Sequence, residues 1–349
     1  MPFGGLIFLT SGLYMGWSLG ANDAANIFGT AVGTRMVKFK TAAILSIIFI
    51  TVGAVISGGG AAHGLGALGA VNALPGSFVV SLCAAFTVMW MTKMGLPVST
   101  TQAIVGAIIG WNLFSGYPTD QEALTRIVGT WVFGPILGAA IAFILFFIVR
   151  YPLSRVSIHL IRLDKYTRTA LILAGVFGAY SLGANNMANV VGVFIEASPF
   201  RDLTVVGFTF TGTQQLFMVG GLAAGVGVAT YSKRVMMTVG SRLFKLSPIT
   251  AFVVIVSTAL VLFLFASQGL KEAMESVGLP SFPLVPVSQS QAAVGSILGV
   301  GLAKGGRNLN LGLLRNIVLG WVATPAVAAV LAYIALFIMQ NVFMQPVYV

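Results

Sequence analysis

The sequence predicts an all-α protein that crosses a membrane many times, and its composition, hydropathy pattern and internal repeat all indicate this class. Of the 349 residues, 57% are hydrophobic and 8% are charged, whereas soluble domains carry about 25% charged residues. The apolar runs lack the period-two alternation of an outer-membrane barrel. Because a spanning helix needs about 20 apolar residues, we expect about 10–12 membrane segments in total.

The expected spans are read along the chain in order. Apolar runs lie at 4–19, 41–57, 77–92, 127–149, 169–182, 203–229, 249–267 and 312–340. Two shorter segments, 97–115 and 286–303, must also cross for the topology below to hold. The first run continues into a polar motif and has no basic residues before it, so we expect it to be retained and not cleaved as a signal peptide. The lone Cys83 excludes an internal disulfide.

Positive charge predicts the orientation. With the N-terminus outside, the inside segments are 35–40, 93, 150–168, 230–246 and 304–315. These segments hold 16 of the 19 Lys and Arg residues, and such a bias orients membrane proteins. The net charge of +11 is therefore explained by inside loops, without a nucleic acid as partner. The topology has about five crossings in each half, and an odd number points the halves in opposite directions.

Three sequence blocks recur in the same order. YMGWSLGANDAANIFGTAVG (14–33) aligns with FGAYSLGANNMANVVGVFIE (177–196), LPVSTTQAIVGAIIG (96–110) with VPVSQSQAAVGSILG (285–299), and WVFGP (131–135) with WVATP (321–325). We therefore expect a first repeat over 1–149, a basic linker over 150–168 and a second repeat over 169–349. Inverted repeats of this kind are typical of transporters whose substrate and ion sites lie near the membrane midplane, between broken helices.

The first block places a carboxylate inside a predicted span. A continuous helix over 4–34 would be about 46 Å long, beyond the hydrocarbon core of about 30 Å, so we expect a break or strong tilt near Gly20. An ionised Asp23 at that depth needs a positive partner, and no Lys or Arg lies at comparable depth. A proton or a cation remains, and Na⁺ suits carboxylate and amide oxygens. The candidate cation ligands are Asn22, Asp23, Asn26, Asn185, Asn186 and Asn189.

The second block predicts two helix starts that face an anion. In PVSTTQ (97–102) and PVSQSQ (286–291), hydroxyls and amides follow a proline and a Gly/Ala-rich helix begins. Such N-termini bind anions without a fixed positive charge. The candidate anion ligands are Ser99, Thr100, Thr101, Gln102, Ser288, Gln289, Ser290 and Gln291. Each block alone is also compatible with helix packing or ordinary capping, but their recurrence in both halves favours binding.

GANDAAN with GANNMAN, and PVSTTQ with PVSQSQ, resemble the paired signatures of the inorganic phosphate transporter (PiT) family. The resemblance implies inverted repeats with hairpin tips, frequently dimeric, in a multi-pass protein of the cell (inner or plasma) membrane. It also implies phosphate transport coupled to Na⁺ or H⁺ without a cofactor; related members are sulfate permeases. The family usually has an aspartate where this chain has Asn186, which leaves the number of coupled cations open.

The leading hypothesis is therefore a secondary active transporter that imports inorganic phosphate with Na⁺ or H⁺ by alternating access, not an enzyme. A sulfate permease of the same family is the alternative. An uncoupled anion channel would tolerate loss of the Asp23 charge. An intramembrane aspartyl enzyme would need two carboxylates in one site, and only Asp23 lies well inside a predicted span.

Overall fold

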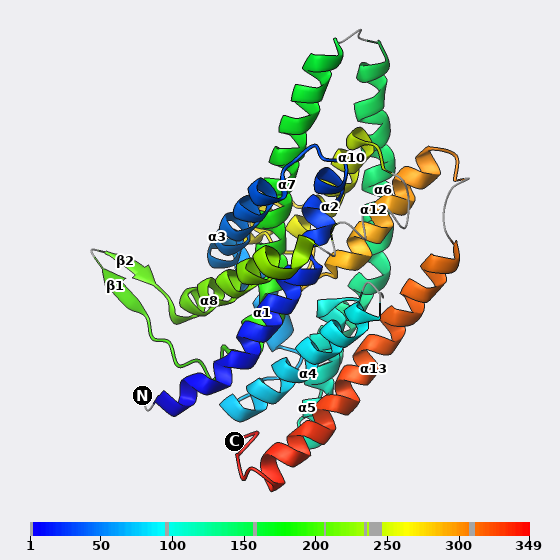
Figure 1. Cartoon of the computed structure of the whole chain (residues 1–349). Helices are drawn as coiled ribbons and strands as arrows, with labels where there is room; N and C mark the ends of the chain where they lie inside the picture. The colour runs from blue at the N-terminus through cyan, green and yellow to red at the C-terminus, as the bar shows by residue number, and fades with distance from the viewer. Residues whose placement is uncertain are drawn as a thin grey trace.

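The computed structural model describes residues 3–94, 98–155, 159–205, 207–233, 236, 246–306 and 311–349, and helices make up most of them (Figure 1). In chain order the elements are η1 (Phe3–Leu9), α1 (Thr10–Asn22), α2 (Ala24–Gly33), α3 (Phe39–Gly66), α4 (Leu74–Lys93), α5 (Thr100–Ser115), α6 (Gln121–Arg155), α7 (Leu160–Val191), η2 (Gly192–Phe194), β1 (Leu203–Val205), β2 (Phe208–Phe210), α8 (Gly212–Gly227), the π-helical turn η3 (Val228–Ser232), α10 (Pro248–Leu264), α11 (Gln268–Ser276), α12 (Gln289–Ala303) and α13 (Leu311–Asn341).

Within these residues, six helices are long and apolar enough to span a membrane: α3, α4, α6, α7 with η2, α8 with η3, and most of α13. The pair α10 and α11, bent by 72°, would be a seventh. The helices α5 and α12, of 16 and 15 residues, reach only about 24 Å, less than a full crossing. The expected 10–12 segments are therefore not all full-length spans, because that count included broken and hairpin segments.

The predicted span over 203–229 is wrong at its beginning. Strands β1 and β2 pair there as an antiparallel hairpin, with Leu203 opposite Phe210 and Thr204 opposite Thr209. Helix α8 begins only after Thr211, whose hydroxyl accepts the N–H of Gln214 at 3.1 Å. This cap starts the helix, and the threonines and aromatic residues before it suit a strand. An apolar run alone does not distinguish these two conformations.

Helices from the beginning of the chain pack against helices from the later part. Helix α3 packs along α7 and α1 along α8, while α5 packs on α13 and α12 on α6. When the helices of the two predicted repeats are matched in order, α1 corresponds to α7, α3 to α8, α5 to α12, and α6 to α13. Each contact then has a counterpart in the other half. Figure 1 shows the same interleaving of early and late helices.

Glycines permit these close contacts. A side chain at Gly20 would collide with the backbone carbonyl of Ala224 in α8, and one at Gly183 with that of Ile50 in α3. Both glycines precede Ala-Asn in the repeated block. Helices in lipid use small residues in this way to bring their backbones together.

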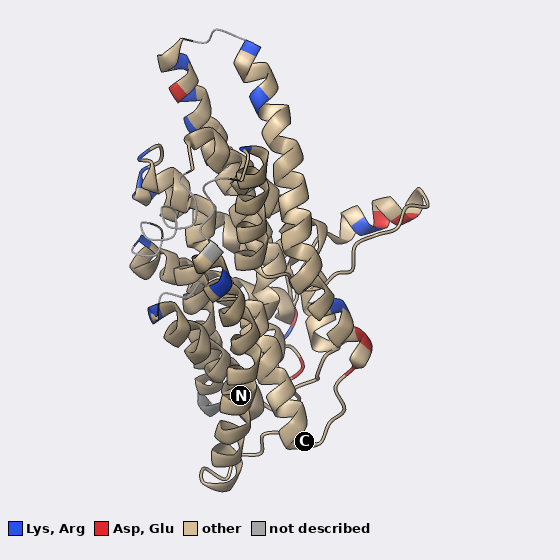
Figure 2. Ribbon diagram, turned by 90° about the vertical axis from the view of Figure 1, so that its right-hand side faces the viewer, with Lys and Arg blue, Asp and Glu red and all other residues tan. Residues whose placement is uncertain are grey.

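The basic residues are unevenly distributed. In Figure 2 most Lys and Arg positions along the ribbon lie at the top and along the left, whereas most Asp and Glu positions lie to the right and lower right. Helix α6 continues to Arg155 and α7 begins at Leu160, so most of the predicted linker consists of the ends of two long helices. At these ends Arg150 lies over the Phe146 ring and Arg155 over the Tyr151 ring, 5.6 and 4.4 Å from the centroids.

Candidate functional site

Asp23 lies at a one-residue interruption between α1 and α2. Its backbone keeps helical dihedral angles, φ −80° and ψ −30°, and its N–H donates to the Leu19 carbonyl at 2.7 Å. Its side chain is 1% exposed. The expected break near Gly20 is therefore confined to Asp23, and Gly20 itself lies within α1. The helix is therefore interrupted only at the residue that carries the carboxylate, and no longer segment is unwound.

The second half contains no corresponding break in its described helix. Asn185, Asn186 and Asn189 all lie inside α7, which runs unbroken from Leu160 to Val191, and all three side chains are fully buried. Gly183, the counterpart of Gly20, lies within α7 and faces the Ile50 carbonyl as described above. These asparagines therefore offer side-chain groups, while helical hydrogen bonds occupy the backbone.

Each PVS motif forms a capped helix start, as the sequence predicts. We call the segment 98–102 tip one and the segment 285–291 tip two; Pro97 lies outside the described residues. In tip one the Ser99 hydroxyl accepts the N–H of Gln102 at 3.2 Å, and α5 begins. In tip two the Ser288 hydroxyl accepts the N–H of Gln291, also at 3.2 Å, and α12 begins. The remaining N–H groups of each first turn are available to a ligand.

Tip one contacts Asp23 directly. Thr100 Oγ1 donates to Asp23 Oδ2 at 3.1 Å, and Asn22 Nδ2 donates to Asp23 Oδ1 at 3.2 Å. Asn22 Nδ2 also lies 3.3 Å from the Val98 carbonyl, as donor. The carboxylate therefore lies beside the first turn of α5, held by neutral donors.

These donors do not replace a positive charge. Among the residues that the structure describes, Asp23 is the one buried acidic side chain, and the three salt bridges lie elsewhere. A helix N-terminus contributes about 0.3–2 kcal/mol to a nearby anion. Burying an unpaired carboxylate costs at least several kcal/mol. The larger cost requires a cation or a proton at Asp23.

Tip two is held by asparagines of α7. The Asn185 side chain makes two hydrogen bonds to the backbone of tip two. Its Nδ2 donates to the Val285 carbonyl at 3.2 Å, and its Oδ1 accepts the Val287 N–H at 2.6 Å. Asn186 Nδ2 donates to the Val287 carbonyl at 3.1 Å. The extended backbone before α12 is thus fastened to α7 by neutral hydrogen bonds.

A hydrogen-bond relay joins the two tips. Asn189 Nδ2 donates to Thr101 Oγ1 at 2.8 Å, and the Thr101 hydroxyl donates onward to the Val287 carbonyl at 3.3 Å. The Val287 oxygen therefore accepts from both Thr101 and Asn186, which uses both of its lone pairs. The sequence predicts that the two motifs meet, and this relay places them in contact.

Several buried acceptors near the tips have no partner. Within the described residues, the side-chain oxygens without a hydrogen bond include Gln102 Oε1, Asn186 Oδ1, Asn189 Oδ1, Gln289 Oε1 and Gln291 Oε1. Because buried polar groups are normally paired, five such oxygens from the predicted blocks indicate a ligand or water at this place. Asn26 differs from the other candidates: it is half-buried, and the described part of the chain provides no hydrogen bond to its side chain.

The described residues contain no group of three or more His, Cys, Asp or Glu side chains that could hold a metal ion. Such clusters bind transition metals. A site of one carboxylate with hydroxyl and amide oxygens instead suits a hard monovalent cation.

Sequence reasoning missed two serines and the backbone groups of the tips. Ser18 and Ser181 are at most 1% exposed, and their hydroxyls have no partner among the described residues. The signal was present, since both stand in the identical string SLGAN of the repeated block. The carbonyls of Val98, Val285 and Val287 could not be identified from the sequence, because every residue has a backbone carbonyl.

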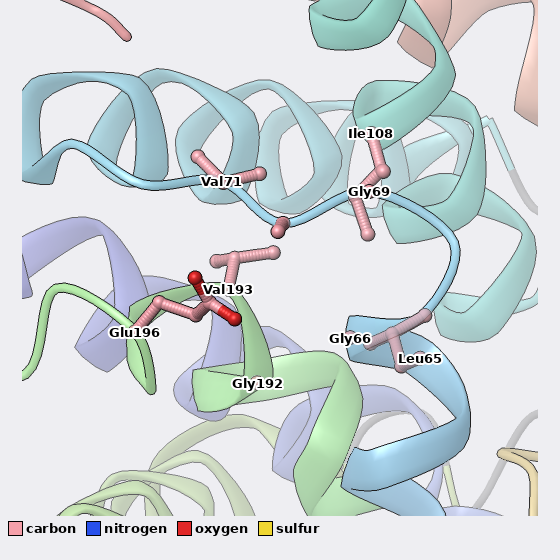
Figure 3. Close-up of a pocket in the computed structure, with 9 residues that line it drawn as sticks. Leu65, Gly66, Gly69, Val71, Ile108, Gly192, Val193 and Glu196 are labelled. Atoms are coloured by element: carbon pink, nitrogen blue, oxygen red, sulfur yellow. The ribbon is translucent and has the colours of Figure 1, made fainter. Parts of the chain in front are cut away.

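A pocket of about 250 Å³, including open solvent, lies away from the tips. It is bounded by the end of α3, the segment 66–71, Ile108 of α5 and η2. Figure 3 shows the Glu196 carboxylate beside Val193, facing the segment that carries Val71. None of the predicted site residues lines it. Ile108 follows Thr100 by two helical turns, about 12 Å along α5.

Comparisons with known proteins agree over nearly the whole chain. Residues 19–332 match the phosphate transporter family. A protein of Thermococcus kodakarensis, provisionally named a phosphate permease, is 26% identical over 402 residues, covering 94% of this chain and 95% of that protein. A similarly named protein of Methanocaldococcus jannaschii is 28% identical over 322 residues, covering 92% and 93%. A solved structure, described as the sodium-dependent phosphate transporter, is 25% identical, with a TM-score of 0.74, covering 96% of this chain and 99% of that one.

Proposed function

Because the chain belongs to the phosphate transporter family, we propose that it imports inorganic phosphate together with a cation, Na⁺ or H⁺, by alternating access. The observation that carries this proposal is the relay from Asn189 through Thr101 to Val287. It brings two helix N-termini together beside one buried carboxylate. A helix N-terminus can bind an oxyanion, and a buried carboxylate can bind a cation. The junction of the tips therefore has groups for both ligands.

In this proposal the anion lies at the junction of the two tips. Ser99, Thr100, Thr101 and Gln102 of tip one, with Ser288, Gln289, Ser290 and Gln291 of tip two, supply hydroxyl, amide and backbone donors. All eight side chains are at most 3% exposed. Hydrogen bonds to charged groups are the stronger ones, and they strengthen further when water is excluded.

The cation is proposed to bind Asp23, with amide oxygens of the asparagines nearby. Asn186 Oδ1 and Asn189 Oδ1 are available acceptors, since their amide nitrogens already donate to Val287 and Thr101. The name of the structural neighbour, a sodium-dependent transporter, supports Na⁺ as the coupling ion. A proton on Asp23 would meet the same electrostatic requirement.

Alternating access is proposed to follow from two inverted repeats, 1–149 and 169–349, joined by the linker 150–168. The duplicated helix contacts support this division. Gly106 faces the Pro325 carbonyl and Gly295 faces that of Pro135, so each tip helix packs on the last helix of the other half. We further propose a homodimer in the cell (inner or plasma) membrane, on the family resemblance.

Uptake into proteoliposomes tests the proposal. Labelled phosphate is offered under an inward Na⁺ gradient, with choline replacing Na⁺ in one arm and a pH gradient imposed in another. Asp23→Asn should abolish cation-dependent uptake, because the amide carries no charge for the cation to neutralise. Asp164→Asn, which removes an exposed carboxylate paired with Arg168, is the matched control and should retain wild-type uptake.

Each outcome selects one function. Uptake that follows pH and ignores Na⁺ replaces sodium with a proton. Uptake of sulfate without phosphate moves the assignment to a sulfate permease. Anion flux that persists in Asp23→Asn without a Na⁺ gradient or a pH gradient indicates an anion channel. Absence of phosphate and sulfate flux in the wild-type protein contradicts transport and reopens the intramembrane enzyme hypothesis.

A further inference from the structure

A segment after α13, residues 345–349, folds back onto the end of the molecule that the charge pattern predicts to lie outside. We call this segment the strap. Within it Val347 is fully buried, and its carbonyl accepts the indole N–H of Trp111 in α5 at 2.9 Å. A side chain at Gly76 of α4 would collide with the same carbonyl. Figure 1 shows the C-terminus at the opposite end of the molecule from the junction of α6 and α7.

The strap also holds the loop between α3 and α4, residues 67–73, which we call the outer loop. Asn72 Nδ2 donates to the main-chain oxygen of Val349 at 2.9 Å, and Asn72 Oδ1 accepts the Val349 N–H at 3.1 Å. The Tyr117 hydroxyl donates to the same oxygen at 3.0 Å, and the Tyr117 ring stacks on Trp111. Asn72 is only half-buried, so water can replace its bonds at a small net cost. The strap is therefore fastened by bonds that can break and form again.

The outer loop separates the strap from the pocket beside Glu196. Gly69 and Val71 of the loop lie on one side of this pocket, and Val193 and Glu196 lie on the other (Figure 3). The strap bonds to Asn72, the residue directly after Val71. A movement of the strap would therefore reach the wall of the pocket.

The pocket lies at the outer ends of both helices that carry the relay. Its wall includes Ile108 of α5, seven residues after Thr101, and Gly192, three residues after Asn189. These separations correspond to about 10 and 5 Å along a helix. Leu65 and Ile108 line the pocket and are each 1% exposed. A phosphate ion or a cation would lose its water against these apolar side chains at a high cost, so a route from the pocket to the tips opens only when they move apart.

The groups that hold the strap and the outer loop are absent from the aligned positions of the second half. The alignment of α5 with α12 continues from the repeated block to Trp111 and Asn112, which correspond to Val300 and Gly301. Trp111 donates to the strap, and Asn112 Nδ2 donates to the Leu68 carbonyl of the outer loop at 3.1 Å. Valine and glycine have no side-chain donor. Two inverted halves with equal ends would close either side at similar free energy. The strap therefore favours closure of the outer side.

We propose that the strap is the latch of an outer gate: while it holds the outer loop, the route from outside to the two tips is closed, and it releases in each transport cycle. The proposal rests on the function proposed above and deepens it, because it names the segments that control entry. Asn72 and Trp111 are positioning residues in this gate. Locking the strap should therefore stop transport, and weakening it should expose the pocket.

Cross-linking tests whether the strap must release. In a Cys83→Ala background, which removes the one native cysteine, Asn72→Cys and Val349→Cys are joined by a short bifunctional thiol reagent that a reductant cleaves. We expect the cross-link to reduce cation-dependent phosphate uptake in proteoliposomes by about tenfold or more, and the reductant to restore it, because a locked gate prevents turnover. The matched control joins Thr204→Cys with Thr209→Cys, which lie opposite each other in the β hairpin. This control should keep uptake within about twofold, since the hairpin is on the surface.

A reporter cysteine measures the opening of the gate without transport. In the same background, Val193→Cys places a thiol at a pocket position that is 6% exposed, and its reaction rate with a methanethiosulfonate reagent is measured in detergent. Trp111→Phe removes the N–H that Val347 accepts but keeps an aromatic ring beside Tyr117. We expect the reporter to react about three to ten times faster, which is the population shift from one lost hydrogen bond. An exposed cysteine, Thr125→Cys, is the control and should react at the same rate with Trp111 or Phe at position 111.

Two results would overturn the proposal. One is undiminished uptake by protein in which Asn72→Cys and Val349→Cys are fully cross-linked, which would make the strap a fixed part of the fold. The other is a Val193→Cys reporter whose reaction rate does not change with Trp111→Phe. If Trp111→Phe does not fold, Asn72→Ala, which removes both side-chain bonds to Val349, takes its place. Failure of the proposed function appears differently, as a wild-type protein without phosphate uptake whose reporter rate still depends on the strap.

Discussion

At the scale of single residues, the local surroundings of Asp23 and Asn186 determine what each can do. The sequence predicts a buried Asp23 near the PVS motif, and the structure places it, 1% exposed, against Thr100. Its role as cation ligand stays a prediction. The relay through Thr101 could not be predicted, because it depends on the Val287 carbonyl, and a backbone group has no sequence signature. Asn26 shows the converse, since the repeat included it although its side chain lies outside the hydrogen-bonded cluster.

The relay residue Thr101 provides a prediction at this scale. Thr101→Val keeps the shape but removes the hydroxyl, so Asn189 Nδ2 and the Val287 carbonyl each lose a partner. An unsatisfied buried group costs about 1–3 kcal/mol. We expect cation-dependent phosphate uptake in proteoliposomes to fall about tenfold or more, with normal protein yield. Uptake equal to that of the control variant Asp164→Asn would show that the junction of the tips does not need this bond.

At the scale of elements, the repeated glycines have a different role from the one that the sequence predicts. The motif predicts a break or strong tilt near Gly20, yet Gly20 and its counterpart Gly183 both lie within helices and face carbonyls of α8 and α3. Glycine suits both roles, and the sequence does not show which neighbour approaches it. The beginnings of α5 and α12 were more predictable, because an N-cap is a local interaction. The hydroxyls of Ser99 and Ser288 each accept the N–H of the residue three positions later in the chain.

A pair of glycine substitutions tests this role. Gly183→Ala would place a methyl group against the Ile50 carbonyl, whereas a methyl group at Gly33, also a helical position, would meet no neighbouring atom within 4 Å. We expect Gly183→Ala to destabilise the protein by about 1–3 kcal/mol through overpacking. Gly33→Ala should be neutral or slightly stabilising, since alanine favours helix. Melting in detergent, followed by size-exclusion chromatography, compares the two. Equal melting temperatures would contradict the close contact as a constraint.

At the scale of the whole molecule, early and late helices interleave around the two tips. The class of the fold was predictable from composition and hydropathy, because lipid imposes length and apolarity on every span. The number of full spans was not, since α5 and α12 are apolar but too short to cross. The β hairpin at 203–210 was also missed, because its residues are as apolar as those of a span. Tertiary packing decides these cases, and local pattern does not.

We propose that the junction of the two tips, beside Asp23, is the anion site. A crystal structure with arsenate, which has the shape of phosphate and a strong anomalous signal, tests it most directly. We expect one anomalous peak in the presence of Na⁺, within hydrogen-bond distance of the first turn of α12 and close to Thr101. A peak elsewhere, for example in the pocket beside Glu196, with none between the tips, would contradict it.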